Sequence, residues 1–378
     1  MKTNEMKVLT VTGTARERGQ TIGEELRESI HCMIEKHDQT IIKRGYSTEA
    51  YKAAFNQYHR YLDAVTKWTP DLLEEVWGLA EGAGISRETA FQLQLVDEDW
   101  SFDAYHFAPR AKIANKCTSF GMVGENGIPT YAGQNMDIPS YVDGHQVLLR
   151  IQYPESDLES LVYTFAGSIV LCGMNNSPLG VNCNTLMQLG GCVDGLPVAF
   201  VARTILEQTT YSDAIAFLNT IKHAAGQNYI LSTIDKVGSF ECSPNQVVEY
   251  CPRVDGSRVC HTNHPLANED VDNFRELIKT ASHNGWVRGY CDTSSRFASI
   301  AARTMNRTGS VELDELKAAL SAKDDVDHQV CRDHSTDINA SAIAFTAGSL
   351  IYEMTENPKL HLAAGPPSES EFMTFEFT

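Results

Sequence analysis

The sequence predicts an α+β fold in which strands and helices form separate layers, preceded by a helical N-terminal segment. Three observations lead to this prediction. Apolar residues recur at helical spacing through roughly the first hundred residues, and strand-like runs begin abruptly at Cys117. Hairpin-like strands, helices and further hairpins then follow one another in blocks. Such blocks are typical of a layered α+β domain and not of alternating strand–helix units.

Helices are expected in four stretches before Cys117. In the first, Ile22, Leu26 and Ile30 recur at helical spacing among charged residues. Ser47 is a good N-cap for the second, and Pro70 suits the first turn of the third. The expected helices cover Ala15–Lys43, Ser47–Val65, Pro70 to a glycine stop at Gly82–Gly84, and a shorter segment after Ser86.

Strands and helices alternate in blocks after Cys117. The turn Gly124–Gly127 predicts a hairpin between the first two strands. Strands are expected over Thr118–Val123, Thr130–Asn135, Val147–Tyr153, Leu161–Phe165, Ile169–Cys172, Gly180–Asn184, Tyr229–Thr233, Ser239–Cys242, Val247–Tyr250, Arg258–Cys260, Ala342–Thr346 and Ser349–Glu353. Helices are expected over Val198–Glu207, Tyr211–His223, Asn268–Ala281, Thr293–Met305 and Val311–Ser321, and a tail rich in proline and glycine ends the chain.

Composition excludes several classes of function. The 378-residue chain carries 31 basic and 49 acidic residues, and its formal net charge of −18 repels phosphate backbones and anionic lipid surfaces. We therefore expect neither a nucleic-acid nor a membrane partner, and no apolar run reaches the roughly 18 residues of a membrane span. The ten cysteines form no CxxC pair, and residues 1–19 contain no secretory signal. Both features indicate reduced thiols and a cytoplasmic protein.

Four short runs hold the candidate chemistry. Cys117-Thr118-Ser119 begins the first strand, and Gly133-Gln134-Asn135-Met136-Asp137 closes the first hairpin. Antiparallel pairing through the hairpin turn would bring Asp137 close to Cys117. Much later, Cys260-His261-Thr262-Asn263-His264 follows a strand, and Thr293-Ser294-Ser295-Arg296 is expected to open a helix.

These runs, KCTSF, GQNMD, HTNH and SSR in that order, resemble the acyl-coenzyme A:6-aminopenicillanic acid acyltransferase family. That family also includes β-alanyl-amine hydrolases and belongs to the N-terminal-nucleophile (Ntn) hydrolases. The runs RERGQTIGEELR at Arg16–Arg27 and AAGPP at Ala363–Pro367 agree with it more weakly. The resemblance spans nearly the whole chain, and the order and spacing of the four central runs are its specific part.

The resemblance implies an αββα sandwich that is made as an inactive precursor. The bond between Lys116 and Cys117 would cleave itself. The two resulting segments, residues 1–116 and 117–378, would stay together as one domain. Cys117 would then be the nucleophile, with its own α-amino group as base, because a thiol of pKa near 8.5 needs a base at neutral pH.

The resemblance also assigns roles to four further residues. Asp137 matches the residue that orients the amino group, and Asn263 matches the side-chain oxyanion donor. Arg296 matches the arginine that fixes the nucleophile end. Asn184 is similar to a further donor in related bile-salt and penicillin hydrolases. No metal and no cofactor is implied.

Two positions depart from the family pattern. Lys116 stands where glycine is usual, and a residue with a Cβ restricts the strained geometry that favours self-cleavage, so slow maturation is expected. Met136 replaces a commoner tryptophan, which affects the packing or the acyl pocket and not the chemistry.

Each candidate residue also has a structural interpretation. Cys117 alone would be a small buried apolar residue, and Asp137 would cap a hairpin or pair with a surface cation. Asn263 would be a turn residue, and Arg296 a helix residue in a surface ion pair.

Two other kinds of site are also conceivable. Cys260, His261 and His264 invite a metal site, but the HxxH spacing lacks the i, i+4 helical pattern. The 144 residues between Cys117 and His261 fit a papain-like protease, whose CGSC signature is absent.

Two classes of function therefore remain open. The leading hypothesis is an enzyme that cleaves the amide of a small N-acyl compound through a thioester. Hydrolysis is favoured over acyl transfer from coenzyme A, because no glycine-rich phosphate loop or basic cluster is present. The second is an unprocessed, non-catalytic binding protein, which Lys116 motivates. The partner would be a small amide or acyl donor, and whether the chain forms a homo-oligomer is left open.

Overall fold

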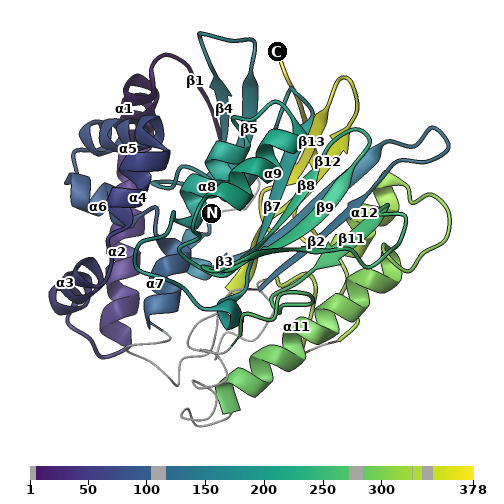
Figure 1. The fold of residues 1–378 in the computed structure, drawn as a ribbon. Helices are drawn as coiled ribbons and strands as arrows, with labels where there is room; N and C mark the ends of the chain where they lie inside the picture. The colour runs from purple at the N-terminus through teal and green to yellow at the C-terminus, as the bar shows by residue number, and fades with distance from the viewer. Residues whose placement is uncertain (1–5, 104–115, 272–283, 326, 334–343) are drawn as a thin grey trace.

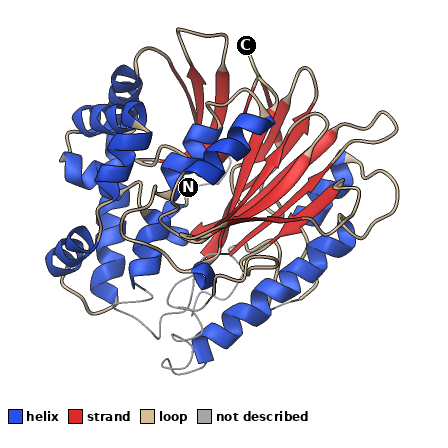
Figure 2. Ribbon diagram, viewed as in Figure 1, coloured by secondary structure: helices blue, strands red, loops and turns tan. Residues whose placement is uncertain are grey.

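The computed structural model describes residues 6–103, 116–271, 284–325, 327–333 and 344–378. Two β-sheets lie face to face, and helices cover the outer face of each (Figures 1 and 2). A bundle of helices formed by the N-terminal part of the chain lies at one side of the two sheets. The predicted layered α+β class is confirmed, and the order of the layers is helix, sheet, sheet, helix.

The larger sheet has eight strands in the described part of the chain. All neighbours pair antiparallel except the first two, which are parallel. In spatial order the strands are β1 (Lys7–Val11), β4 (Gln146–Gln152), β5 (Glu159–Phe165), β6 (Cys172–Asn175), β7 (Leu179–Thr185), β8 (Gln227–Ser232), β9 (Val237–Cys242) and β10 (Val247–Tyr250).

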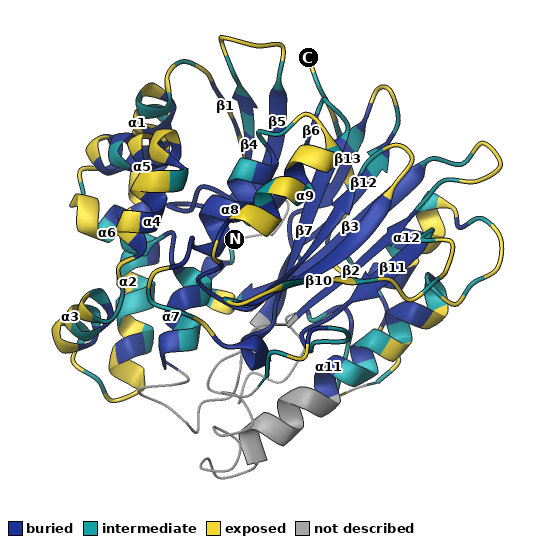
Figure 3. Cartoon of the chain, in the orientation of Figure 1, coloured by how far each residue is buried: buried dark blue, intermediate teal, exposed yellow. Residues whose placement is uncertain are grey.

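The smaller sheet has six strands in the described residues, and all of them pair antiparallel. In spatial order they are β11 (Arg258–His261), β2 (Lys116–Met122), β3 (Thr130–Pro139), β12 (Ala344–Met354), β13 (Lys359–Ala363) and β14 (Met373–Glu376). Strands β2 and β3 contact β7 and β8 of the larger sheet, so the two sheets share an inner core. Both sheets are buried along most of their length (Figure 3).

Helices close the outer faces. α8 (Val198–Ile205) contacts β7 of the larger sheet, and α9 (Tyr211–Thr220) packs beside α8. α11 (Asn284–Arg303) and α12 (Leu313–Leu320) pack on the smaller sheet. Phe120 and Ile351 point outward from this sheet into an apolar cluster with Ile300 and Leu316. Cys117 belongs instead to the inner core, because the pleat of β2 places residues 117 and 120 on opposite faces.

Seven helices before Cys117 form the side bundle in the described residues. They are α1 (Ala15–Glu25), α2 (Arg27–Lys43), α3 (Thr48–Tyr58), α4 (Tyr61–Trp68), α5 (Pro70–Ala83), α6 (Arg87–Gln92) and α7 (Val96–Phe102). α1 and α5 approach so closely that a Cβ on Gly19 or Gly78 would overlap the backbone of the other helix.

The local signals behave largely as expected. Ser47 caps α3 by accepting a hydrogen bond from the Ala50 backbone N–H, and Gly84 ends α5 in the left-handed conformation. Two long expected helices are each divided in two. The first divides at Leu26, and the second divides at His59, whose backbone is extended.

Several strand predictions are corrected. The strand expected at Ile169–Cys172 begins only at Cys172, and the final pair of strands is one strand, β12, with an irregularity between Thr346 and Gly348. β1, β13 and β14 were not predicted, the last one within the expected tail. Residues 268–271 are not helical, and the rest of the helix expected over Asn268–Ala281 lies outside the described residues.

Candidate active site

Cys117 lies at the start of β2, in the first hairpin of the sandwich. Antiparallel pairing places Cys117 opposite Met136 and Lys116 opposite Asp137, so the hairpin brings Asp137 close to Cys117, as expected. The hairpin turns through Asn126 and Gly127, both with positive φ, which is the geometry that an Asn-Gly turn favours. The Cys117 side chain is only 4% exposed, and its Sγ lies 3.6 Å from Met136 Sδ.

Arg296 and Asn263 hold the main chain of Cys117 from two sides. Arg296 Nη1 donates to the Cys117 carbonyl oxygen at 2.7 Å and to Thr118 Oγ1 at 2.9 Å. The Cys117 backbone N–H donates to Asn263 Oδ1 at 2.7 Å. The same Oδ1 accepts from Arg296 Nη2 at 3.0 Å. Because a guanidinium only donates hydrogen bonds, the atom of Asn263 that faces it is the oxygen.

The amide nitrogen of Asn263 points elsewhere in this uncleaved chain. Asn263 Nδ2 donates to the Thr185 carbonyl oxygen at 3.1 Å. The loop that carries Asn263 is held by Thr293, whose Oγ1 accepts from the Asn263 backbone N–H at 2.7 Å. Gln188 Nε2 donates to the Asn263 carbonyl oxygen at 3.0 Å. Asn263 therefore presents a fixed acceptor to the backbone nitrogen of residue 117.

Arg296 lies inside a helix, which corrects the expectation that Thr293–Arg296 opens one. α11 already begins at Asn284. The Thr293 hydroxyl binds the Asn263 loop and donates to Thr262 Oγ1 at 2.9 Å. Thr293 therefore makes a tertiary contact from within the helix and does not begin it.

Asp292 positions Arg296, and the sequence analysis missed it. Its Oδ2 accepts from Arg296 Nε at 2.9 Å, one turn along the same helix. Its Oδ1 lies 3.3 Å from both Arg332 Nη1 and His328 Nδ1. The i, i+4 spacing of an acidic and a basic residue was the available signal.

Asp137 is buried beside Cys117 with one oxygen free. Its Oδ1 accepts from Thr346 Oγ1 at 2.7 Å, whereas Oδ2 has no hydrogen-bond partner among the described residues. Burial raises the pKa of Asp137 to about 6, although the Arg296 charge opposes this change. The site therefore contains a carboxylate that lacks a partner for its second oxygen.

The Cys117 thiol is strongly protonated in the uncleaved chain. Burial, and then the neighbouring Asp137 carboxylate, raise the pKa of Cys117 to about 12, although a hydrogen bond from the Asp137 backbone lowers it. A thiol of this pKa is a weak nucleophile without a base close to its sulfur.

Asn184, on β7 of the larger sheet, lies beside Ser119 of β2. Its Oδ1 accepts from Ser119 Oγ at 2.6 Å and from Asn228 Nδ2 at 3.2 Å. Its Nδ2 is buried and has no partner among the described residues. Since Ser119 and Cys117 share one face of the strand, Asn184 lies on the same side of the sheet as the thiol and has a free donor.

A cavity of about 40 Å³ adjoins these residues. Cys117 and Asp137 of the sandwich line it together with Asp97 and Trp100 of α7. Asp97 accepts from Thr185 Oγ1 at 2.5 Å, and burial raises its pKa to about 6. The sequence analysis missed Asp97, whose signal was the acidic run Asp97-Glu98-Asp99 within an otherwise apolar helix.

The alternative mechanisms find little support in the geometry. His261 uses both ring nitrogens away from Cys117, with Glu241 Oε1 at 2.8 Å and the Thr262 carbonyl oxygen at 2.8 Å. It is therefore not placed as a papain-like base. No group of three or more His, Cys, Asp or Glu side chains in the described part of the chain is arranged to hold a metal ion. No helix there is both long and apolar enough to cross a membrane.

Sequence comparisons identify relatives. A family model described as acyl-coenzyme A:6-aminopenicillanic acid acyl-transferase matches residues 123–368, a range that contains Asp137, Asn184, Asn263 and Arg296. The chain is 28% identical over 262 residues to the 40 kDa form of acyl-coenzyme A:6-aminopenicillanic-acid-acyltransferase from Emericella nidulans. That alignment covers 67% of this chain and 70% of the relative.

Solved structures with a distant likeness to this chain include three enzymes. An ortholog of N-acylethanolamine-hydrolyzing acid amidase from Caenorhabditis elegans is 14% identical, with a TM-score of 0.42 over 63% of this chain and 92% of that one. A mutant of conjugated bile acid hydrolase from Clostridium perfringens is 14% identical, with a TM-score of 0.44 over 69% and 97%. Penicillin V acylase from Agrobacterium tumefaciens is 17% identical, with a TM-score of 0.40 over 69% and 86%.

The family assignment depends on the sequence matches, which cover well over half of the chain. They confirm the resemblance given by the four short runs. They also confirm the prediction of an enzyme that acts on C–N bonds, as an amide hydrolase or an N-acyltransferase. The protein belongs to the acyl-coenzyme A:6-aminopenicillanic acid acyl-transferase family.

Proposed function

We propose that the protein is a self-processing cysteine Ntn amidohydrolase that cleaves the linear amide bond of a small N-acyl compound through a thioester. One observation carries the proposal. Arg296 and Asn263 each bind a main-chain atom of Cys117 at 2.7 Å, and Asp137, with its free oxygen, lies beside the same residue. A merely buried cysteine needs no such hold on its backbone, whereas a nucleophile that uses its own amino group does.

Self-cleavage would begin with attack of Cys117 Sγ on the Lys116 carbonyl carbon. The C–N bond between the two residues breaks, the nitrogen takes the thiol proton, and Lys116 is held as a thioester. Water then hydrolyses the thioester, giving a free carboxylate on Lys116, the thiol of Cys117 and a new α-amino group. The division into segments 1–116 and 117–378 stays part of this proposal.

The mature site would use that amino group as its base. With an ordinary pKa of about 7.7–8.0, the group can accept the Cys117 proton at neutral pH. The free Oδ2 of Asp137 is then available to the ammonium that forms. Asn263 Oδ1, which already accepts a hydrogen bond from this nitrogen, would keep it oriented.

Catalysis would follow in two balanced steps. The thiolate adds to the substrate carbonyl carbon, the C–N bond breaks, and the leaving amine takes the proton from the ammonium. Water, deprotonated by the amino group, then hydrolyses the thioester and releases the carboxylic acid. Asn184 Nδ2 is an available donor for the oxyanion. Asn263 Nδ2 can be a second donor once its hydrogen bond to the Thr185 carbonyl oxygen is broken.

The cavity favours hydrolysis over acyl transfer from coenzyme A. Its lining includes the carboxyl groups of Asp97 and Asp137 and contains no lysine or arginine among the described residues, so it offers no cation to an anionic phosphate. Acyl transfer from coenzyme A is the second candidate, because the relative from Emericella nidulans is named for that donor. A cytoplasmic location, expected from the cysteine usage, stays a prediction.

Trapping the acyl-enzyme tests this function. Processed protein is mixed with N-acyl amines, quenched in acid and weighed by mass spectrometry. The fragment of residues 117–378 should gain the mass of the acyl group, and the Cys117→Ala variant should gain none. Adding a second amine separates hydrolysis from transfer, because transfer yields a new amide. Turnover by Cys117→Ala at the wild-type rate would contradict the mechanism.

A further inference from the structure

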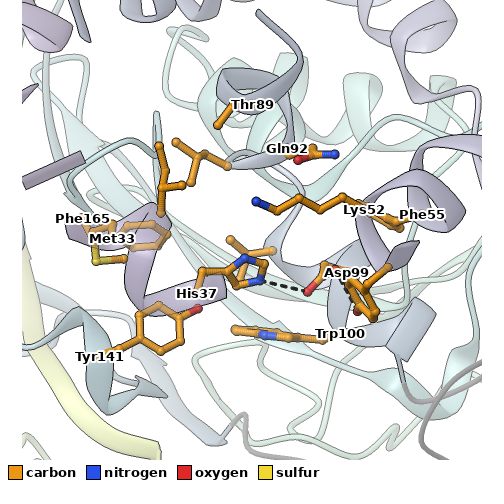
Figure 4. A pocket seen from close by; sticks show the side chains of 14 residues that line it. Met33, His37, Lys52, Phe55, Thr89, Gln92, Asp99, Trp100, Tyr141 and Phe165 are labelled. Carbon is orange, nitrogen blue, oxygen red and sulfur yellow. Dashed lines mark hydrogen bonds and ion pairs between the residues drawn. The ribbon is translucent and has the colours of Figure 1, made fainter. Parts of the chain in front are cut away.

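A second cavity, of about 60 Å³, lies within the side bundle, away from Cys117. Side chains of α2, α3, α6 and α7 line it, and Tyr141 and Phe165 from the sandwich close one side (Figure 4). Its walls are mainly aromatic and aliphatic, with Phe55, Trp100 and Tyr141 among the rings. Both segments of the proposed mature protein therefore contribute to it.

This cavity adjoins the one beside Cys117. Val96 and Trp100, one turn apart on α7, line both cavities. Between them, Asp97 faces the Cys117 cavity, whereas Asp99 faces the cavity in the bundle. The helix α7 is thus a common wall, and the Trp100 side chain borders both spaces.

The charged groups of the bundle cavity are matched within the protein. Lys52 Nζ forms an ion pair with Asp38 Oδ1 at 2.5 Å. Asp99 accepts from Tyr51 OH at 3.0 Å and lies 3.5 Å from His37 Nε2. An ionic ligand would have to displace one of these partners, whereas a neutral apolar group would not. The chemistry of the walls therefore fits a neutral aromatic or aliphatic group.

We propose that the bundle cavity is a second subsite, which binds a neutral apolar arm of the amide whose carbonyl carbon reacts at Cys117. Such an arm would pass Trp100, whose side chain lies between the two cavities. This inference rests on the proposed function, since it extends the same substrate path. The arm belongs either to the acyl group or to the amine, and the experiment below separates the two.

The first measurement is binding, which needs no turnover. Two series of neutral amides serve as probes: phenylalkanoyl methylamides and N-acetyl phenylalkylamines with one to four methylenes. Calorimetry with the full-length Cys117→Ala variant should show tighter binding in one series. The gain should approach about fourfold for each methylene that enters the cavity. The series that shows the gain identifies the arm.

A blocking variant and a matched control locate the binding. Thr89 lines the bundle cavity, and Thr89→Phe should fill it and abolish the dependence on arm length. Thr66→Phe adds the same ring at an exposed threonine of α4 and should leave that dependence unchanged. Trp100→Ala removes the side chain between the two cavities and serves as an independent variant. In this variant, affinity should continue to rise with longer arms.

Turnover then connects the cavity to Cys117. In the processed wild type, the ratio of kcat/KM between long-armed and short-armed amides should follow the binding data, and Thr89→Phe should collapse it. If affinity does not depend on arm length, or if the dependence persists in Thr89→Phe, the bundle cavity is not the subsite. An arm that binds but does not change kcat/KM would overturn its place on the substrate path. Absence of turnover for every amide would instead count against the proposed function.

Discussion

The two parts of the molecule on either side of Cys117 contribute differently to the site. The sandwich after residue 117 provides the groups that hold Cys117, and these are tightly bonded to one another through Arg296 and Asn263. The bundle before it provides walls, such as Asp97 and Trp100, and a second cavity. If the proposed function holds, the segment after the cut supplies the reacting groups, and the segment before it supplies walls that contact the substrate.

Strand pairing, a buried ion pair and a side-chain hydrogen bond also anchor the bundle in the sandwich. Its first strand, β1, pairs in parallel with β4 of the larger sheet. Glu75 is fully buried between Arg18 at 2.9 Å and Arg203 of α8 at 3.3 Å. Glu98 Oε1 accepts from the Val198 backbone N–H at 2.9 Å. Cleavage before Cys117 would therefore leave the walls of the cavities in place.

The largest effect should come from the sandwich side, at Asp137. Asp137→Asn keeps an oxygen for Thr346 but removes the negative charge beside the amino group. We expect kcat to fall by about 10²- to 10⁴-fold, the range for losing acid–base assistance. Rates measured on processed protein check this, and unchanged kinetics would make Asp137 a structural residue.

The stability of the same variant separates function from structure. The pKa of Asp137 in the folded chain, about 6, lies above the ordinary value, so its charged form costs stability once the pH exceeds the unfolded value. Asp137→Asn should therefore be at least as stable as wild type at pH 7.

The next effect lies at the junction between the two parts. Lys116 is the first residue of β2 and pairs with Asp137, so its peptide bond must leave extended geometry to be attacked. A residue with a Cβ adds on the order of 1–3 kcal/mol to such a distortion, or roughly 5- to 150-fold in rate. Lys116→Gly should speed maturation by that factor in a gel time course. Turnover of the mature enzyme should not change, and equal maturation rates would show that Lys116 imposes no strain.

The smallest effect should come from the bundle side, at Glu98. Burial, and then the Asp97 carboxylate, raise the pKa of Glu98 to about 8. The folded chain therefore binds this proton more tightly than the unfolded chain, and wild-type stability should decline between about pH 4.5 and pH 8. Glu98→Gln removes this contribution, so its free energy of unfolding should exceed that of wild type by on the order of 1–3 kcal/mol at pH 8.5. Denaturant unfolding measures this difference. Glu28→Gln, on an exposed part of α2, is the control, and parallel pH profiles of stability for both variants would show that Glu98 does not cause the decline.

The sequence predicted the features that depend on local signals. The turn at Gly124–Gly127 predicted the hairpin that brings Asp137 close to Cys117, and Ser47, Pro70 and Gly84 marked helix ends correctly. These signals act within a few residues, so a single sequence contains them. The order of the four short motifs was enough to identify the family.

Features that depend on tertiary contacts could not be predicted from local sequence signals. The run Thr293–Arg296 was expected to open a helix, because nothing in the sequence showed that α11 begins at Asn284 or that the Thr293 hydroxyl binds the loop of Asn263. β1 pairs with a strand more than a hundred residues away, and its short apolar run carries no partner signal. The shared wall at Trp100 likewise exists only once the bundle packs on the sandwich.

The account depends most directly on the bond between Lys116 and Cys117. Purified protein, incubated until no further change occurs, should be weighed intact by mass spectrometry and its new N-terminus sequenced. We predict two chains, residues 1–116 and 117–378, with the second beginning Cys-Thr-Ser and carrying the amide-cleaving activity. A single uncleaved chain of 41.8 kDa, active or not, would contradict an N-terminal nucleophile at Cys117.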